Sequence, residues 1–474
     1  MHRQNNIDKH IYTIVKVFIG LFAIIFINLA YIQVYQAEAL LKDSHNSHVA
    51  EKAAQVQRGK ILDRNGIVLA DTNVDEKNNF KRVYPYGEVF ASPIGYVSDK
   101  LGYAGIESTQ NTYLAGNNLV LHALGPIAQL FEQNVGNDVH LTLNADYQQA
   151  AYEALGNRKG AVVVLNRKTG EVLAMVSRPM FNPNTIDDDW DNLRVDENSP
   201  LLNRASQGLY PPGSVIKPMI GDGALTTGVA DTGTVVNCTG ALQLSGGYSL
   251  SDSSGEVHGS VNLAKAIEES CNSYFGTMGI RLGSKGLKDT FSRFGYDQEL
   301  DTDFINNKPQ LPDFDNLSDG ELAQVGIGQS TLLVTPLRMA MLAGSIGNDG
   351  IMMKPFVVKE ITAPDNSVLE QHQPMTWRQV SSPEIINIIY EDMKNVINHG
   401  TGTRANVPGI EMIGKTGTAE NSTGKDHAWF IGCANMPNED IAFAVIVENS
   451  GFGGSEAAPI IKNILTSILA KEGK

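Results

Sequence analysis

An apolar segment near the N-terminus, residues 11–34, sets the first limit on how this chain can fold. The segment is nearly all apolar, broken by Lys16, Asn28 and Gln33 near its ends or one turn in. A run of this length is long enough to cross a bilayer as a helix. The sequence therefore predicts one transmembrane helix, with the following residues outside the membrane.

The charges beside this segment indicate its orientation. Arg3 and Lys9 precede it and Glu38 follows it, so the positive-inside rule favours a cytoplasmic tail of residues 1–10. Ala-Glu-Ala at residues 37–39 resembles a signal-peptidase site, and cleavage of the segment stays an alternative. Because the run is longer than a usual signal core, we expect a retained, single-pass anchor in the cell membrane with an extracytoplasmic remainder.

Composition narrows the class of protein. A chain of 474 residues with 42% hydrophobic residues can form two or three globular domains. The formal net charge of −15 argues against nucleic acid as a partner. The three cysteines, Cys238, Cys271 and Cys433, are odd in number and lack a Cys-x-x-Cys spacing. We therefore expect separate buried thiols, with neither a disulfide framework nor a zinc site.

The chemistry centres on residues 210–217, Tyr-Pro-Pro-Gly-Ser-Val-Ile-Lys. The prolines and glycine predict a rigid entry into a helix, with Pro218 in its first turn, where a missing N–H costs least. Ser214 and Lys217 are three residues apart, so one helical turn places the hydroxyl and the amine on one face. Ser-x-x-Lys alone occurs by chance on many helices and is weak evidence.

Two further motifs strengthen the interpretation. Ser270-Cys271-Asn272 follows an amphipathic run, and Lys415-Thr416-Gly417-Thr418 lies in an alternating, strand-like stretch. Ser-x-x-Lys, a Ser-x-Asn triplet and Lys-Thr-Gly in this order are the signature of penicillin-binding proteins and class A β-lactamases. The chain resembles a class B penicillin-binding protein, a monofunctional peptidoglycan D,D-transpeptidase.

The resemblance implies roles for the motif residues. Ser214 is the nucleophile, and Lys217 is its base if burial and the nearby Lys415 keep the amine partly neutral. Ser270 relays a proton to the leaving amine, and Asn272 binds a substrate amide and holds Lys217. No metal or organic cofactor is required.

The third motif supplies the substrate-binding strand. Lys415, Thr416 and Thr418 suit a terminal carboxylate, and Gly417 allows the substrate to run against the strand edge. The resemblance implies an oxyanion hole from the backbone N–H groups of Ser214 and Thr418. No histidine lies at a suitable motif position, so a Ser-His-Asp triad is not favoured.

The expected fold is of the α/β (α+β) class, with a transpeptidase domain like those of penicillin-binding proteins and serine β-lactamases over residues 137–474. Strands at 160–165, 171–176, 409–419, 428–434 and 441–447, with a closing helix at 456–469, predict a central antiparallel sheet flanked by helices. Residues 36–136 are expected to form a small non-catalytic pedestal. Its Arg58–Ala70 stretch resembles the box that opens the extracytoplasmic part of class B proteins, and Asn65-Gly66 predicts a hairpin. The pedestal is too short for a glycosyltransferase domain.

Other functions share parts of this pattern. A serine β-lactamase is normally smaller and has no pedestal, and a β-lactam sensor needs further spans or a cytoplasmic effector. A catalytically silent scaffold is not favoured because all three motifs are intact. The expected partners are peptidoglycan stem peptides ending in D-Ala-D-Ala, an acceptor amine, β-lactams, and a membrane glycosyltransferase.

Overall fold

The computed structural model describes residues 2–32, 56–76, 79–98, 100–116, 135–244, 247–421 and 424–473. The possible signal-peptidase site at residues 37–39, which includes Glu38, lies outside the described residues. Helix α1 (His2–Tyr31) covers most of the predicted transmembrane segment. Within it, Tyr12–Tyr31 is long and apolar enough to span a membrane, and its side chains are exposed. Such a surface is consistent with a lipid environment.

An N-terminal module is built on a six-stranded sheet in the order β15-β14-β6-β1-β2-β3. Its strands are β1 (Ile61–Leu62), β2 (Val68–Val74), β3 (Phe80–Val83), β6 (Asp138–Leu141), β14 (Val358–Thr362) and β15 (Val368–Gln371). Shorter elements accompany it: η2 (Gly87–Phe90), α4 (Ala91–Ile94), β4 (Val97–Ser98), β5 (Gly102–Tyr103), α5 (Gly105–Thr109) and α6 (Asn111–Leu114). Strands β1 to β3 of this sheet precede residue 136 in the chain, and β6, β14 and β15 follow it. Residues 358–371 therefore return to the N-terminal module late in the chain.

The predicted hairpin forms between β1 and β2, with a wider turn than two residues. Leu62 pairs with Val68, and Gly66 takes the left-handed conformation with φ of 83°. The buried carboxylate of Asp63 closes the turn by accepting from the N–H groups of Asn65 and Ile67, each at 2.8 Å. The Arg58–Ala70 stretch is thus a structural element, as predicted.

A buried ion cluster holds the same module together. Glu107 is fully buried and accepts from Arg58 Nε at 2.6 Å and Arg82 Nε at 2.7 Å. Burial opposes ionisation of Glu107, but the two guanidinium groups prevail and hold the pKa of this carboxyl below its usual value. The cluster ties α5 to the segments at residues 58 and 82.

The predicted central sheet is present, and all its strand pairs are antiparallel, in the order β17-β18-β19-β7-β8. Its strands are β7 (Gly160–Asn166), β8 (Val172–Arg178), β17 (Met412–Ala419), β18 (His427–Asn435) and β19 (Asp440–Val447). The apolar runs in these strands are continuous because both faces of the sheet are buried. On β7, Val162 and Val164 join one core, and Ala161 and Val163 join the other.

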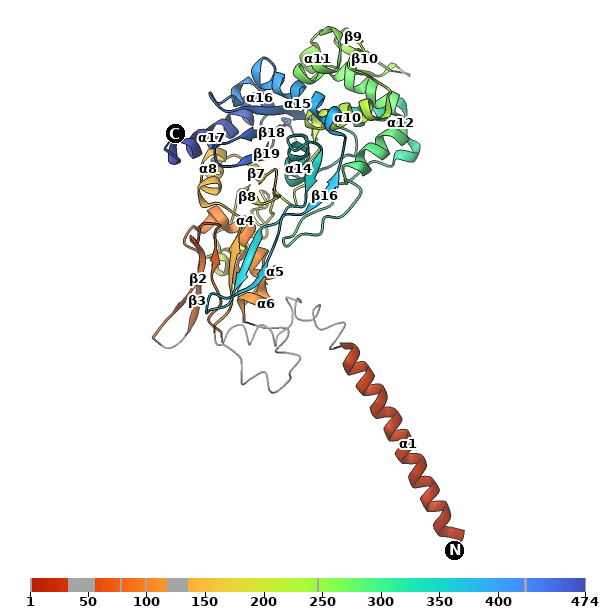
Figure 1. The fold of residues 1–474 in the computed structure, drawn as a ribbon, viewed down its shortest axis with the longest axis vertical. Coiled ribbons are helices and arrows are strands. Elements are labelled where there is room, and N and C mark those ends of the chain that lie inside the picture. Colours follow the sequence, from red (N-terminus) through yellow and green to blue (C-terminus); the bar gives the residue numbers. More distant parts are fainter. Residues whose placement is uncertain are drawn as a thin grey trace.

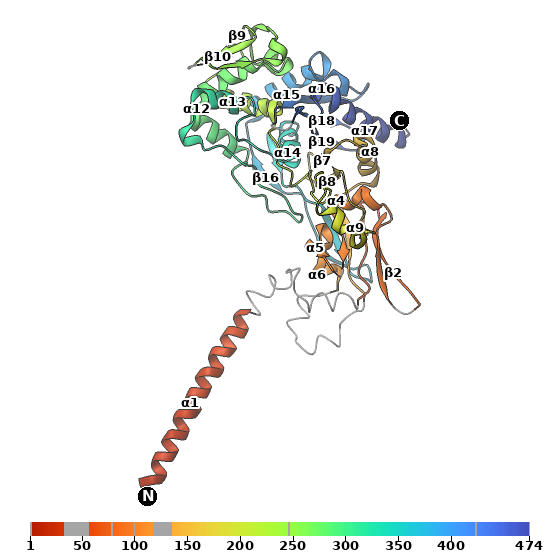
Figure 2. The ribbon, with the colours of Figure 1, turned by 180° about the vertical axis from the view of Figure 1, so that it is seen from behind.

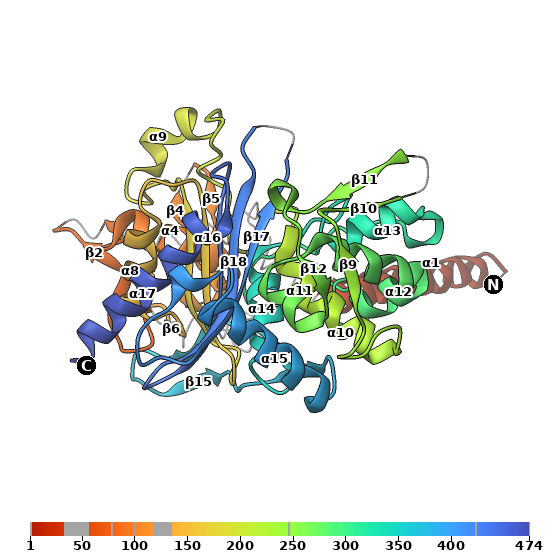
Figure 3. The same cartoon turned by 90° about the horizontal axis from the view of Figure 1, so that it is seen from above.

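Helices cover both faces of this sheet (Figure 3). On one side lie α8 (Ala145–Leu155) and the closing helix α17 (Ala458–Lys471), and the side chain of Asn144 caps α8. On the other side lies α14 (Pro336–Ile346), whose residues are all buried. The remaining helices are α9 (Ile186–Leu193), α10 (Lys217–Thr227), α11 (Leu263–Glu268), α12 (Asn272–Arg293), α13 (Asp319–Gly326), α15 (Pro383–Asn398) and α16 (Gly453–Glu456).

Residues 56–473 end, opposite to the N-terminal module, in a helical lobe that contains α10 to α13 (Figures 1 and 2). It also carries the short strands β9 (Val236–Cys238), β10 (Ala241–Gln243), β11 (Ser249–Ser251) and β12 (Gly259–Val261). Strands β13 (Ile351–Met353) and β16 (Thr376–Gln379) pair with each other. The three sequence motifs meet where the helical lobe adjoins strand β17.

Candidate active site

Ser214 lies in a short 3-10 turn, η4 (Gly213–Ile216), that runs directly into α10. Two other backbone segments lie close to Gly213 and fix the position of this turn. Gly213 N donates to Gly328 O at 2.9 Å, and a Cβ on Gly213 would lie 2.5 Å from Thr418 O. Ser214 itself is partly exposed, and its hydroxyl has no hydrogen-bond partner among the described residues. The turn therefore presents the hydroxyl on a rigid support beside β17.

Lys217, one helical turn after Ser214, is fully buried. Its Nζ donates to Asn272 Oδ1 at 2.7 Å, to Ser270 O at 2.6 Å and to Ser270 Oγ at 3.2 Å. Removal from water disfavours the charged amine and lowers the pKa of Lys217 to about 7, despite the opposing effects of Cys271 and Asp252 nearby. A substantial fraction of this lysine is therefore neutral at neutral pH.

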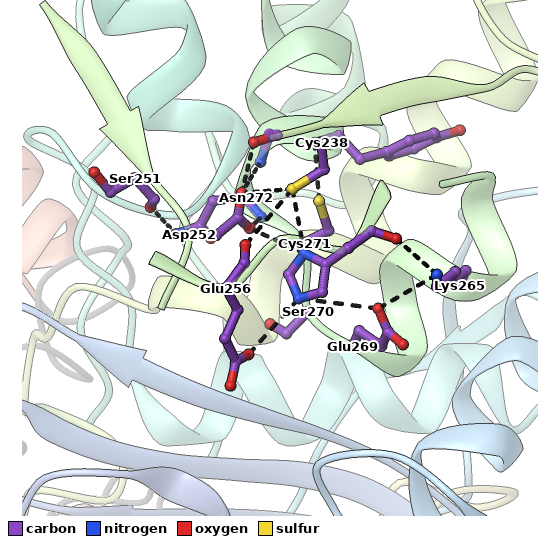
Figure 4. A network of polar contacts seen from close by, with 12 residues as sticks. Cys238, Ser251, Asp252, Glu256, Lys265, Glu269, Ser270, Cys271 and Asn272 are labelled. Carbon is purple, nitrogen blue, oxygen red and sulfur yellow. Dashed lines mark hydrogen bonds and ion pairs between the residues drawn. The ribbon is translucent and has the colours of Figure 1, made fainter. Parts of the chain in front are cut away.

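The second motif forms the sharp turn between α11 and α12. Ser270 takes a left-handed conformation with φ of 61°, which is uncommon for a residue other than glycine. Cys271 caps α12, and Asn272 is its first residue. The Asn272 side chain donates to Ser251 O at 2.8 Å, and its backbone N–H donates to Asp252 (Figure 4). The strained turn thus aims both Ser270 and Asn272 at Lys217.

The third motif lies on β17, the edge strand of the central sheet. Lys415 is fully buried, and burial together with the charge of Lys217 holds the pKa of its amine well below the usual value. Thr416 Oγ1 shares a 2.6 Å hydrogen bond with Thr401 Oγ1. A Cβ on Gly417 would lie 2.8 Å from Val215 Cγ1, so glycine allows the Ser214 turn to pack here. Thr418 is partly exposed at the same edge.

The structure therefore brings together every residue that the motifs indicated. Two supporting residues were not predicted from the sequence as part of the site: Asp252, which holds the start of α12, and Gly328, which contacts the Ser214 turn. Neither residue carries a sequence signal for the site, because Gly328 lies in a Gly-Ile-Gly sequence and Asp252 in a Gly- and Ser-rich stretch. His427 Nδ1 accepts from Asn449 N at 3.1 Å.

Within the described part of the chain, one group of side chains could hold a metal ion, and it adjoins this site. Cys238, Asp252, His258 and Cys271 bring their ligand atoms within 4.8 Å of one another. This arrangement differs from the expectation of separate buried thiols, because two of the three cysteines meet.

Known families match both parts of the chain. Residues 160–466 match the penicillin-binding protein transpeptidase domain, and residues 58–137 match the dimerisation domain of penicillin-binding protein A. The chain belongs to the penicillin-binding transpeptidase family. The resemblance inferred from the three motifs is confirmed, and the fold class is that of the family.

Individual relatives agree with this membership. The peptidoglycan D,D-transpeptidase PbpA of Mycolicibacterium smegmatis is 31% identical over 96% of this chain and 97% of its own length. Penicillin-binding protein A of Mycobacterium tuberculosis, solved as a ceftriaxone acyl-enzyme complex, is 30% identical, with a TM-score of 0.82 over 89% of this chain and 100% of that one. A D,D-transpeptidase domain from Eggerthella lenta is 31% identical, with a TM-score of 0.80 over the same shares.

Proposed function

We propose that this protein is a serine-type peptidoglycan D,D-transpeptidase that β-lactams inhibit covalently. One observation carries the proposal: a buried lysine with a pKa near 7 follows the serine by one turn and is held by the Ser-x-Asn motif. An amine that is partly neutral can accept the proton of a serine hydroxyl. The names of relatives that span nearly the whole chain support this function.

During acylation, the proton taken from the serine hydroxyl is passed on to the leaving amine. Ser214 Oγ gives its proton to neutral Lys217 Nζ and bonds to the carbonyl carbon of the penultimate D-Ala of a stem peptide. The bond to the terminal D-Ala breaks, and its nitrogen takes a proton from Lys217 through Ser270 Oγ, which lies 3.2 Å from Nζ. An acceptor amine reverses these steps, attacking the ester and releasing Ser214.

Strand β17 would bind the donor peptide. Because β17 is an edge strand, an extended peptide can add to it through backbone hydrogen bonds. Lys415, Thr416 and Thr418 would bind the terminal carboxylate, and Gly417 leaves room for the Ser214 turn against the strand. The N–H groups of Ser214 and Thr418 would stabilise the oxyanion. Asn272 would also bind an amide of the substrate.

Water would react only slowly with the acyl-enzyme of this protein, and slow hydrolysis distinguishes a transpeptidase from a β-lactamase. A class A enzyme uses a glutamate to activate the hydrolytic water. Glu299, Glu321 and Glu360 lie between the second and third motifs, in no sequence context that matches the loop of such an enzyme. Glu321 is exposed and engaged in the capping box of α13, Glu360 lies on β14 in the N-terminal module, and Glu299 is exposed.

We also propose the topology and domain division that the sequence predicts. Residues 1–10 are cytoplasmic, 11–34 are a retained anchor, and 36–136 form most of a pedestal, to whose sheet residues 138–141 and 358–371 add strands. The rest of 137–474 is the extracytoplasmic catalytic domain. A membrane glycosyltransferase would supply glycan strands. Finding that the mature protein in cells begins near residue 40 would refute the retained anchor.

Labelling with a fluorescent penicillin tests the function. The Ser214→Ala protein is expected to fold and to lose covalent labelling, whereas Ser467→Ala, the same change on α17 away from the site, retains full labelling. Normal labelling of folded Ser214→Ala would overturn the assignment. Release of D-Ala and formation of cross-links from a stem-peptide substrate measure the transpeptidase activity directly.

A further inference from the structure

Glu448, the residue directly after β19, is a carboxylate on which three other segments of the chain converge. Its Oε1 accepts from Arg204 Nε and from the Tyr210 hydroxyl, each at 2.8 Å. Lys159 Nζ lies 3.3 Å from its Oε2, and the backbone N–H of Glu448 donates to Lys159 O at 2.7 Å. The Glu448 side chain is 11% exposed and that of Arg204 is 1% exposed. Glu448 belongs to none of the three catalytic motifs.

The neighbours of Glu448 keep this carboxylate ionised. Burial opposes its ionisation, but Arg204, Tyr210 and Lys159 prevail and hold the pKa of the carboxyl below its usual value. Burial and the charge of Glu448 raise the pKa of Tyr210 well above its usual value, so the phenol keeps its proton and donates it. A hydrogen bond to a charged acceptor is roughly twice as strong as a neutral one. Glu448 is therefore a fixed anchor rather than a proton carrier at neutral pH.

The rest of Tyr210 is held as firmly as its hydroxyl. Its backbone N–H donates to Val334 O at 3.0 Å and its carbonyl accepts from Val334 N at 2.8 Å. Its ring meets the rings of His427 and Trp429 edge to face, with centroids 5.6 and 6.2 Å apart. Trp429 Nε1 donates to the carbonyl of the next residue, Pro211, at 3.0 Å. The end of β19, the start of β18 and residue 334 thus fix Tyr210 together.

A stiff link connects Tyr210 to the nucleophile. Pro211 and Pro212 separate it from Gly213, and Gly213 begins the turn that carries Ser214. Each proline ring restricts φ to about −65°, so the two prolines leave the link little freedom to absorb a change in the orientation of Tyr210. A displacement of the Tyr210 side chain is therefore passed on to the Ser214 turn.

We propose that Glu448 is a positioning residue for the nucleophile: it anchors Tyr210, and through Tyr210 and the two prolines it sets the place of Ser214 Oγ. This inference rests on the proposed function, because it concerns the serine that is acylated. A misplacement of about 1 Å caused by a change away from the chemistry can slow a reaction about a hundredfold. Loss of the anchor should therefore slow acylation, whereas non-covalent binding of the β-lactam should change little.

Tyr210→Phe tests the anchor with the least disturbance, because it removes one hydroxyl and keeps the Arg204–Glu448 ion pair. The measurement uses the full-length protein in detergent and a fluorescent penicillin over a range of concentrations, which separates the dissociation constant of the first complex from the acylation rate constant. We expect an acylation rate constant about tenfold lower and an unchanged dissociation constant. Tyr152→Phe is the matched control and keeps the wild-type values, since Tyr152 on α8 also donates its hydroxyl to a carboxylate, Glu88, at 2.8 Å.

Glu448→Gln tests the carboxylate itself. The amide keeps an oxygen that can accept from Tyr210 but loses the charge, so its acylation rate constant should lie between those of the wild type and Tyr210→Phe. In the Tyr210→Phe background the same change should cause no further loss, because Glu448 acts through the tyrosine. Glu439→Gln is the matched control: Glu439 directly precedes β19, accepts from Arg64 Nη1 at 2.6 Å, and should leave acylation unchanged.

The outcomes distinguish positioning from general stability. Partial unfolding lowers the fraction of protein labelled at saturation, whereas a misplaced serine lowers the rate constant of protein that is labelled completely. A wild-type rate constant in Tyr210→Phe, an equal loss in Tyr152→Phe, or losses that multiply in the Tyr210→Phe/Glu448→Gln double variant would each overturn this inference and leave the proposed function standing. Wild-type protein that penicillin does not acylate would overturn the proposed function, and this inference with it.

Discussion

Replacing Asn272 by aspartate tests the role of Lys217 through its protonation. Asn272 Oδ1 accepts from Lys217 Nζ at 2.7 Å, and the substitution puts a carboxylate oxygen of similar shape in that position. A carboxylate this close favours the ammonium form and raises the pKa of the lysine by about 1–3 units. The neutral base then appears only at higher pH.

The expected size follows from the pKa of Lys217. With a pKa of about 7, the neutral fraction rises from about one tenth at pH 6 to about nine tenths at pH 8, so wild-type acylation rises about tenfold over this range. A shift of about two units lowers the neutral fraction at pH 7.5 about 25-fold. The loss in Asn272→Asp should therefore be large near neutral pH and should diminish as the pH approaches 10.

The assay is the second-order rate of acylation by a fluorescent penicillin between pH 5.5 and pH 10. Asn463→Asp is the matched control, because it adds the same charge on the exposed face of α17. A rate that falls equally at every pH would leave the midpoint of the profile as in the wild type. That result would refute the view that neutral Lys217 is the base and would attribute the loss to substrate contacts of Asn272.

Three further expectations follow from the geometry. Gly328→Ala should lower the free energy of unfolding by several kcal/mol and slow acylation, because Gly328 has a φ of 79° and a Cβ there would lie 2.2 Å from Gly213 O. Gly66→Ala should lower the free energy of unfolding by only about 1–2 kcal/mol and leave acylation intact, because Gly66 has a φ of 83° but lies in open space. Equal effects of these two substitutions on acylation would contradict the supporting role of Gly328. Arg58→Ala should destabilise the N-terminal module by about 3 kcal/mol in chemical denaturation, since it leaves Glu107 paired with Arg82 alone, and penicillin labelling should persist. The penicillin adduct should remain visible by intact-protein mass spectrometry for minutes to hours, whereas rapid multiple turnover would favour a β-lactamase.

Local sequence patterns determined much of this protein. The apolar runs of the central sheet, the cap at Asn144 and the Pro-Pro-Gly entry each depend on neighbours within a few residues, so the chain itself encodes them. The order of three short motifs was enough to indicate the family, because the chemistry of acyl transfer restricts which residue types can stand there.

Some local predictions needed correction in detail. The Asn65-Gly66 signal located a hairpin, but Asp63 widened the turn by accepting from two backbone N–H groups. Ser214 lies in a 3-10 turn before α10 rather than inside a regular helix. Both differences arise because hydrogen bonds and packing choose among turn conformations that the sequence permits about equally.

Only the tertiary structure decided how distant segments meet. Strands β14 and β15 join the N-terminal sheet from residues 358–371, and Gly328 supports a turn more than a hundred residues before it. No periodicity encodes such contacts, since they depend on how whole elements pack.

The meeting of Cys238, Asp252, His258 and Cys271 makes the same point most clearly. Cys238 and Cys271 show no metal-binding spacing in the sequence, because the loop and the strands between them, rather than a short turn, bring their sulfur atoms together. Spacing rules describe ligands that share one turn or helix. Ligands contributed by four separate segments become visible only when burial of the surrounding chain has fixed where each segment lies.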